Sequence, residues 1–213
     1  MDLVPHGRFG HPYIFERETE STQLLIGPDA QEGAVAVADF QSAGRGRLGR
    51  RWEAPPGTAI HCSIALRPPA ERAPQELTLV GALAAAQAIE EETGLPVQIK
   101  WPNDVLVAGM KVCGALGELR EGLVILGIGI NVNQTDEQLP GETQRPATSL
   151  RSLTGREHDR AALLAAMLLR LETLYDSWSG GGLRPLRPEL EARLEPDNEG
   201  ARRFLATGEV SYS

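Results

Sequence analysis

The sequence has few cysteines and no long apolar segment. Its 213 residues include two cysteines, Cys62 and Cys113, and four histidines scattered along the chain. A disulfide framework or a zinc site needs more partners than this, so we expect two reduced thiols in the core. No apolar run approaches the ~20 residues of a membrane helix, and the N-terminus lacks the basic start and apolar core of a signal peptide. These absences predict a cytoplasmic protein without membrane contacts.

Positive charge is also scarce, because the formal net charge is −8. Proteins that bind duplex nucleic acid usually carry net positive charge or a basic face, so no nucleic-acid partner is expected. One segment departs from this acidic background. The stretch "GRGRLGRRW" over residues 44–52 carries Arg45, Arg47, Arg50 and Arg51. A local cationic cluster of this kind predicts a focused anion site.

The same stretch contains a Gly-x-Gly-x-x-Gly pattern at Gly44, Gly46 and Gly49. A dinucleotide-binding fingerprint requires a helix to start inside the glycine run, and Pro55 and Pro56 oppose a helix there. No Gly-Lys-Ser/Thr of a Walker loop follows any glycine-rich turn. The pattern therefore predicts a glycine-hinged loop whose guanidinium groups close over a carboxylate or phosphate.

A second polar group follows in "KWPNDV" (100–105), where Lys100, Asn103 and Asp104 stand at the end of a strand. The carboxamide and carboxylate can orient neighbours or a magnesium-bound water. Lys111 comes just after a two-residue turn, so its ammonium can project from the sheet rim toward a phosphate. Each of these residues alone would be interpreted as an ordinary solvated side chain, but together with the arginine loop they indicate a site.

Hydrophobic periodicity predicts where strands form. Buried strands are expected over 33–40 and 57–67, the second with alternate residues facing opposite sides. Turn pairs at Ala108-Gly109 and Glu121-Gly122 divide residues 97–132 into hairpin-linked antiparallel strands.

Helices are predicted between and after these strands. The expected segments are a short helix near 20–27 capped by Ser21 or Thr22, one over 74–93 ended by Gly94, one over 148–155, and a long one capped by Asp159. The fold class is therefore α+β, with a mixed, largely antiparallel sheet and helices on one face. We expect a catalytic domain over 1–180 and a shortened β module over 181–213, with a final hairpin around Thr207-Gly208.

Five motifs occur in an order that resembles biotin protein ligases over about residues 20–178. They are "STQ" (21–23), "FQSAGRGRLGRRW" (40–52), "KWPNDV" (100–105), "KVCGALGE" (111–118) and "GIGINV" (127–132). The resemblance implies the catalytic fold that this family shares with class II aminoacyl-tRNA synthetases. It also implies the monofunctional type, because no DNA-binding module precedes the motifs.

The resemblance implies an ATP-dependent ligase. It would activate biotin as biotinyl-5'-AMP, with magnesium, and transfer biotin to a lysine of a biotin carboxyl carrier protein. Lys111 and Arg47 are the expected catalytic residues. Residues expected at biotin are Ser21, Thr22, Gln23, Gln41, Arg45, Gly46, Arg47 and Lys111. Residues expected at ATP or the adenylate are Arg47, Arg50, Trp52, Lys100, Asn103, Asp104, Lys111 and Asn131, with Asp104 also a candidate metal ligand.

The sequence departs from the family pattern at Gln23, where the family usually has Asn, and in its short C-terminal segment. Two alternatives stay open at this point. A lipoate ligase would use the same adenylation chemistry, although the arginine loop and "KWPND" follow the biotin version. A non-catalytic protein that binds biotin or a nucleotide is the other. Pairing into a homodimer is a further expectation, because family members often dimerise.

Overall fold

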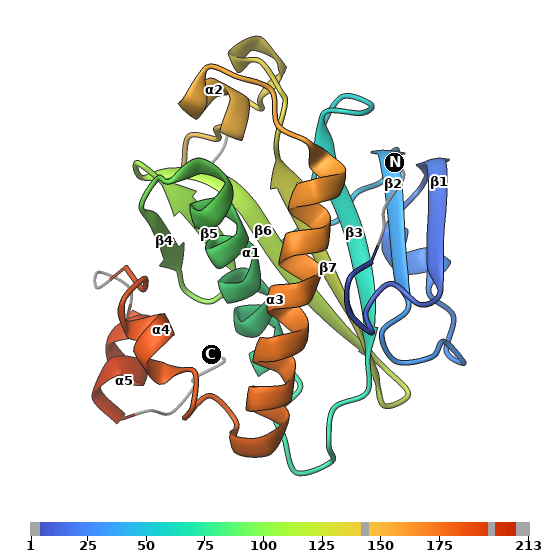
Figure 1. The fold of residues 1–213 in the computed structure, drawn as a ribbon, viewed down its shortest axis with the longest axis vertical. Coiled ribbons are helices and arrows are strands. Elements are labelled where there is room, and N and C mark those ends of the chain that lie inside the picture. Colours follow the sequence, from blue (N-terminus) through green and yellow to red (C-terminus); the bar gives the residue numbers. More distant parts are fainter. Residues whose placement is uncertain (1–4, 142–144, 196–198, 208–213) are drawn as a thin grey trace.

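The structure is a computed structural model that describes residues 5–141, 145–195 and 199–207. Its centre is one sheet with the strand order β1-β2-β3-β7-β6-β5-β4 (Figure 1). The strands are β1 (Tyr13–Thr19), β2 (Val35–Gln41), β3 (Ala59–Leu66), β4 (Val97–Lys100), β5 (Asp104–Val107), β6 (Met110–Arg120) and β7 (Leu123–Asn131).

The sheet is mixed and largely antiparallel, as predicted. Only β1 and β2 pair in parallel, and every other neighbouring pair is antiparallel. The predicted hairpin turns are confirmed. Ala108 and Gly109 join β5 to β6, and Glu121 and Gly122 join β6 to β7; all four have positive φ, from 49° to 82°. Two consecutive left-handed residues match the right-handed twist of the strands that they connect.

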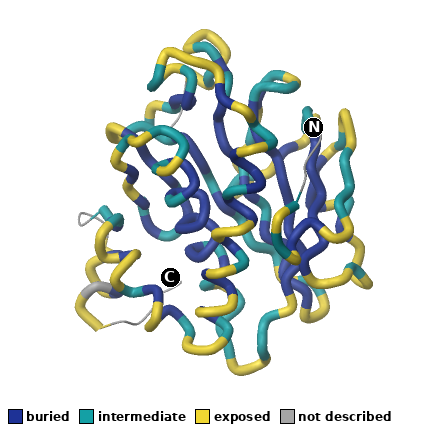
Figure 2. The backbone as a smooth tube through the Cα atoms, in the orientation of Figure 1, coloured by how far each residue is buried: buried dark blue, intermediate teal, exposed yellow. Residues whose placement is uncertain are grey.

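Two long helices, α1 (Glu76–Thr93) and α3 (Arg160–Gly181), cover one face of the sheet (Figure 1). The predicted ends are confirmed: α1 ends at Gly94 with φ 69°, and the Asp159 carboxylate accepts hydrogen bonds from the backbone N–H groups of Ala161 and Ala162. The sheet-facing sides of both helices are buried (Figure 2). Within the described ranges, no helix combines the length and apolar character needed to cross a membrane.

Both cysteines lie in this core. Cys62 on β3 and Cys113 on β6 are buried free thiols, as predicted. Burial raises the pKa of Cys62 to about 12 and also raises that of Cys113, because a thiolate is poorly solvated in apolar surroundings. The two thiols therefore have little nucleophilic character at neutral pH.

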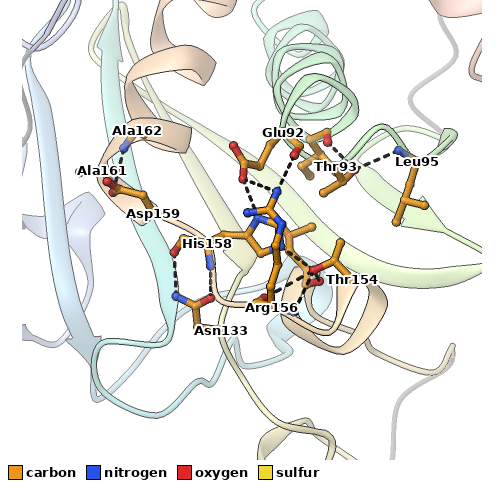
Figure 3. Close-up of polar contacts among 12 residues, drawn as sticks. Glu92, Thr93, Leu95, Asn133, Thr154, Arg156, His158, Asp159, Ala161 and Ala162 are labelled. Atoms are coloured by element: carbon orange, nitrogen blue, oxygen red, sulfur yellow. Dashed lines mark hydrogen bonds and ion pairs between the residues drawn. The ribbon is translucent and has the colours of Figure 1, made fainter.

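A partly buried polar cluster around His158 fixes the chain after β7 (Figure 3). The His158 ring Nδ1 lies 2.6 Å from Glu92 Oε1 at the end of α1, and its Nε2 lies 2.7 Å from Thr154 Oγ1 at the end of α2 (Leu150–Thr154). The Asn133 side chain bonds the His158 backbone N–H and C=O, each at 2.9 Å. This cluster ties α2 and the start of α3 to the end of α1.

The segment around Ser21 differs from the prediction in detail. It forms a short 3-10 helix, η1 (Thr22–Leu25), and the Ser21 side chain makes no capping hydrogen bond. A second 3-10 turn, η2, spans Arg47–Gly49, and a third, η3, spans Asp136–Gln138. In η1 the Thr22 hydroxyl bonds side chains of the sheet instead of the helix backbone.

The predicted β character of the C-terminal segment is wrong for its described residues. They form two helices, α4 (Arg187–Glu191) and α5 (Glu199–Thr207), and only an isolated bridge between Leu194 and Ile99. In α5, Phe204 packs against Trp101 with ring centroids 5.6 Å apart. The spacing of buried Ala201 and Phe204 fits one helical face, and burial of that face stabilises the helix. The helix replaces the first strand of the expected hairpin, whose turn at Gly208 and second strand lie outside the described residues. The division into domains over 1–180 and 181–213 stays a prediction.

Candidate active site

A cavity of about 430 Å³ opens on the face of the sheet opposite α1 and α3. Side chains alternate along each strand, so residues that face the cavity alternate with residues that face the helices. All the residues predicted for biotin and ATP line this cavity: Ser21, Thr22, Gln23, Gln41, Arg45, Gly46, Arg47, Arg50, Trp52, Lys100, Asn103, Asp104, Lys111 and Asn131. The fold therefore brings these residues together from loops and strands that lie far apart in the sequence.

Glycines form the cavity floor. A Cβ atom on Gly129 of β7 would lie 2.5 Å from Cε2 of Trp52, and one on Gly127 would lie 3.1 Å from Nε2 of Gln23. The absence of side chains therefore lets Trp52 and Gln23 lie close against the sheet. The alternating sequence "GIGIN" gives β7 one apolar face toward the core and one open face toward the cavity.

One end of the cavity is polar but uncharged. The Thr22 hydroxyl lies 2.7 Å from the Ser63 hydroxyl, and the Thr22 backbone N–H donates to Gln41 Oε1 at 2.8 Å. Gln23 donates from Nε2 to the Leu116 carbonyl at 3.3 Å, while its buried Oε1 has no partner among the described residues. A buried amide oxygen without a partner is costly, which favours a ligand that donates a hydrogen bond there.

The other end is cationic. Arg47 Nη1 donates to Asn103 Oδ1 at 2.8 Å, and Asn103 Nδ2 donates to Asp104 Oδ1 at 2.8 Å. Lys111 Nζ lies 2.7 Å from the same Asp104 oxygen and 5.6 Å from the centroid of the Trp52 ring. These contacts link the arginine loop to the rim of the sheet. They hold two cations at one end of the cavity with a single carboxylate between them.

The arginine loop is closed by its own backbone. Gly46 N–H donates to the Arg50 carbonyl at 2.8 Å, and Trp52 N–H donates to the Gly44 carbonyl at 3.0 Å. Only glycine fits at position 44, because a Cβ there would lie 2.3 Å from the Trp52 carbonyl oxygen. Leu48 at the tip is 89% exposed and has φ 57°, a left-handed conformation that is unfavourable for leucine.

Asn131 is held by a second network at the end of β7. Its Nδ2 donates to the Thr148 carbonyl at 3.0 Å, and its Oδ1 accepts from Gln134 Nε2 at 2.9 Å. The Ser149 hydroxyl in turn donates to the Gln134 carbonyl at 2.7 Å. The Asn131 carboxamide is therefore fixed in orientation.

Several cavity residues were not predicted from the sequence. His61 and Ser63 on β3 line the cavity, and Arg145 lies at its edge, where it pairs with Glu195 at 2.8 Å. The alternation of residues 59–66 could have identified His61 and Ser63 as a pair on one face. Burial lowers the pKa of His61 to about 4, with a smaller contribution from nearby Arg160, while the Ala38 carbonyl and Asp39 oppose the shift.

Comparison with known proteins assigns the family. Residues 15–134 match the biotin/lipoate A/B protein ligase family, and the chain belongs to that family. It is similar to the bifunctional ligase/repressor BirA of Bacillus spizizenii, with 41% identity over 84% of this chain and 58% of that protein. It is also similar to the biotin–[acetyl-CoA-carboxylase] ligase of Mycobacterium tuberculosis, with 35% identity over 76% of this chain and 59% of that protein.

A solved structure agrees with this assignment. The biotin protein ligase of Aquifex aeolicus in complex with biotin and ATP superposes with a TM-score of 0.77 and 36% identity, covering 85% of this chain and 77% of the other. This similarity confirms the predicted ligase fold. The chain spans less than two-thirds of the length of the two curated relatives.

Proposed function

We propose that this chain activates biotin with ATP and transfers the biotinyl group to a lysine of a biotin carboxyl carrier protein. The observation that carries this proposal is the two-ended cavity, with uncharged polar groups at Thr22, Gln41 and Ser63 and cations at Arg47 and Lys111. Biotin has a matching polarity, because its ureido ring is uncharged and its other end is a carboxylate. The Mycobacterium tuberculosis relative is a biotin–[acetyl-CoA-carboxylase] ligase, and the Aquifex aeolicus structure contains biotin.

In the first step, a carboxylate oxygen of biotin attacks the α-phosphorus of ATP. The bond from that phosphorus to the bridging oxygen of the β-phosphate breaks, and pyrophosphate leaves. Because two anions approach each other, positioned cations lower the barrier more than any other group on the protein. Lys111 is the principal cation in this proposal, and Arg47 supplies the second charge from the loop.

In the second step, the ε-amino nitrogen of the acceptor lysine attacks the acyl carbon of the adenylate. The bond from the acyl carbon to the phosphate oxygen breaks, AMP leaves, and the amine loses one proton to solvent. The adenylate must be shielded from water between the two steps, and in this proposal the arginine loop at the cavity provides that shield. The other proposed contacts are Ser21, Gln23, Arg45 and Gly46 for biotin, and Arg50, Trp52, Lys100, Asn103 and Asn131 for the nucleotide.

Magnesium is part of the proposal as a companion of ATP. The described residues contain no group of three histidine, cysteine, aspartate or glutamate side chains that could hold a metal ion. Asp104 and Asn103 offer one carboxylate and one carboxamide oxygen, which fits an ion that keeps water and phosphate as most of its ligands. When bound, magnesium would neutralise part of the negative charge of the ATP phosphates.

The acceptor and the assembly state complete the proposal. The acceptor is expected to be the biotin carboxyl carrier domain of a biotin-dependent carboxylase, because two curated relatives are biotin–[acetyl-CoA-carboxylase] ligases. A homodimer stays a prediction, and light scattering after size-exclusion chromatography measures it directly.

The test is incubation of the chain with ATP, magnesium and biotin, followed by addition of a carrier domain. Pyrophosphate release that needs both biotin and ATP, and a carrier lysine with the mass of added biotin, are the expected results. Release that depends on lipoate instead would identify a lipoate ligase. Tight biotin binding without pyrophosphate release would identify a binding protein.

A further inference from the structure

His61 is a buried side chain that faces the cavity without a hydrogen-bond partner. It is 1% exposed and lines the cavity. Neither ring nitrogen makes a hydrogen bond of normal geometry to a residue that the structure describes, although the Ala38 carbonyl lies near enough to the ring to favour its protonated form. Buried polar groups are nearly always paired, and each unpaired group costs free energy of folding. An unpaired imidazole at the wall of a ligand cavity therefore points to a ligand atom as the missing partner.

The position of His61 in the sheet indicates which part of a bound ligand would lie beside it. On β3, His61 and Ser63 face the same side and stand roughly 7 Å apart along the strand. Ser63 belongs to the uncharged end of the cavity through its contact with Thr22. The residue paired with His61 on β7 is Gly129, and the Trp52 indole lies over that glycine. His61 therefore lines the cavity on the same strand face as Ser63 and near Trp52. The cationic end of the cavity is formed by other strands, with Lys111 on β6 and its partner Asp104 on β5, and β7 lies between these strands and β3.

The imidazole acts as a neutral group. The pKa of His61 is lowered to about 4 by burial, so the ring carries one N–H donor and one nitrogen acceptor at neutral pH. The charged groups that influence it, Arg160 and Asp39, pair with each other at 3.0 Å. His61 thus adds no charge to the cavity. It offers a donor and an acceptor to an uncharged polar ligand.

We propose that His61 determines specificity for biotin by hydrogen-bonding the uncharged ureido end of the bound vitamin. This inference rests on the proposed function and extends it to a residue outside the recognised motifs. The ureido ring carries N–H donors and a carbonyl acceptor, which match the two nitrogens of a neutral imidazole. A site with an unpaired polar group also discriminates against analogues that cannot satisfy it.

The test compares His61→Phe with His61→Gln and with His6→Phe, a control in the exposed N-terminal segment. The phenylalanine variant keeps a ring without polar atoms, and we expect its Kd and KM for biotin to rise about tenfold. Its KM for ATP should stay within about twofold of the wild-type value, and its Tm should be unchanged or higher because the unpaired nitrogens are gone. The glutamine variant, which keeps a donor and an acceptor, should recover most of the biotin affinity.

A direct observation is available in the wild-type chain. It has four histidines, so ring ¹⁵N–¹H spectra can follow each one separately. Biotin should shift the His61 ring signals and leave those of His158, which lies outside the cavity, unchanged. Biotin affinity of His61→Phe within twofold of wild type, or unshifted His61 signals in the biotin complex, would overturn the inference. A wild-type chain that binds no biotin overturns the proposed function itself, so the two failures are distinguishable.

Discussion

Lys111 Nζ and Arg47 Nη1 are connected through two side chains, Asp104 and Asn103, by three contacts of 2.7–2.8 Å. The lysine comes from β6 and the arginine from the loop after β2, so residues 64 positions apart meet at one end of the cavity. The Asp104 carboxylate pairs with Lys111 directly and reaches Arg47 only through the Asn103 carboxamide, and a negative charge near both cations reduces their mutual repulsion before an anion arrives. It also fixes their positions, which is the preorganisation that phosphoryl transfer requires.

Replacement of Lys111 by alanine tests the proposed principal cation. We expect Lys111→Ala to reduce biotin-dependent pyrophosphate release about 100-fold or more, because loss of one preorganised charge has effects of that order. The free energy of unfolding should fall by only about 1 kcal/mol, since the Lys111–Asp104 pair is partly exposed. Arg170→Ala, which breaks an ion pair with Glu91 outside the cavity, is the matched control. An alanine variant with the full adenylation rate would refute the assignment of Lys111.

Replacement of Arg47 by glycine tests whether the loop retains the adenylate. The change removes the contact to Asn103 and adds backbone freedom, so biotinyl-adenylate should escape and label lysines of a bystander protein several-fold faster. Only two lysines occur in the chain, Lys100 and Lys111, so labelling of the enzyme itself adds little background. Mass spectrometry of the bystander measures the effect. The control Arg51→Gly adds the same backbone freedom but keeps the contact between Arg47 and Asn103, so it should label the bystander protein less. Equal labelling by the two variants would show that loop flexibility alone controls release of the adenylate.

The sequence predicted the sheet and the two long helices, and every residue in its site list lines one cavity, while the roles of these residues at biotin and ATP stay a prediction. These predictions succeed because they depend on local patterns: periodicity along strands, glycine and aspartate caps, and motifs of fixed spacing. The C-terminal helices were missed because they are short and their segments are rich in proline and arginine. Their burial depends on contacts far apart in sequence: Leu190 of α4 lies in the core, and Phe204 of α5 packs against Trp101.

His61 shows a different reason for failure. A single histidine in the apolar strand "AIHCSIAL" resembles a residue of the core, and the strand is buried throughout. Only the three-dimensional arrangement shows that His61 lines the cavity, beside a glycine over which the Trp52 indole lies. The closed geometry of the arginine loop was likewise inaccessible, since it depends on backbone hydrogen bonds that glycine-rich sequences permit but do not specify.

Gly129 provides a test of the cavity floor. A methyl group at this position would lie 2.5 Å from Trp52 Cε2, so Gly129→Ala should displace the indole and its contact with Lys111. Overpacking of this kind typically costs about 1–3 kcal/mol of folding stability. Because the displaced indole is a proposed nucleotide contact, we also expect the KM for ATP to rise about tenfold, which corresponds to about 1.4 kcal/mol of lost binding free energy. Gly180→Ala, where a methyl group meets nothing within 4 Å, should leave the KM for ATP unchanged. Unaltered ATP affinity in Gly129→Ala would show that Trp52 does not shape the nucleotide site.

His61 also predicts how stability depends on pH. The unfolded chain binds a proton at this histidine below about pH 6.5, whereas burial lowers the pKa in the folded protein to about 4. The neutral His61 ring therefore costs the folded protein no stability above pH 6.5. As the pH falls from 6.5 to 4, the free energy of unfolding decreases, and the total loss is about 3 kcal/mol for a shift of this size. This loss is measured by urea unfolding of the wild type and of His61→Phe at pH values from about 7.5 to about 4, roughly the range over which histidine titrates. Carboxylates titrate in both proteins, so the difference between the two curves isolates His61. The wild-type protein should lose more stability on acidification, and parallel curves would contradict a buried neutral imidazole.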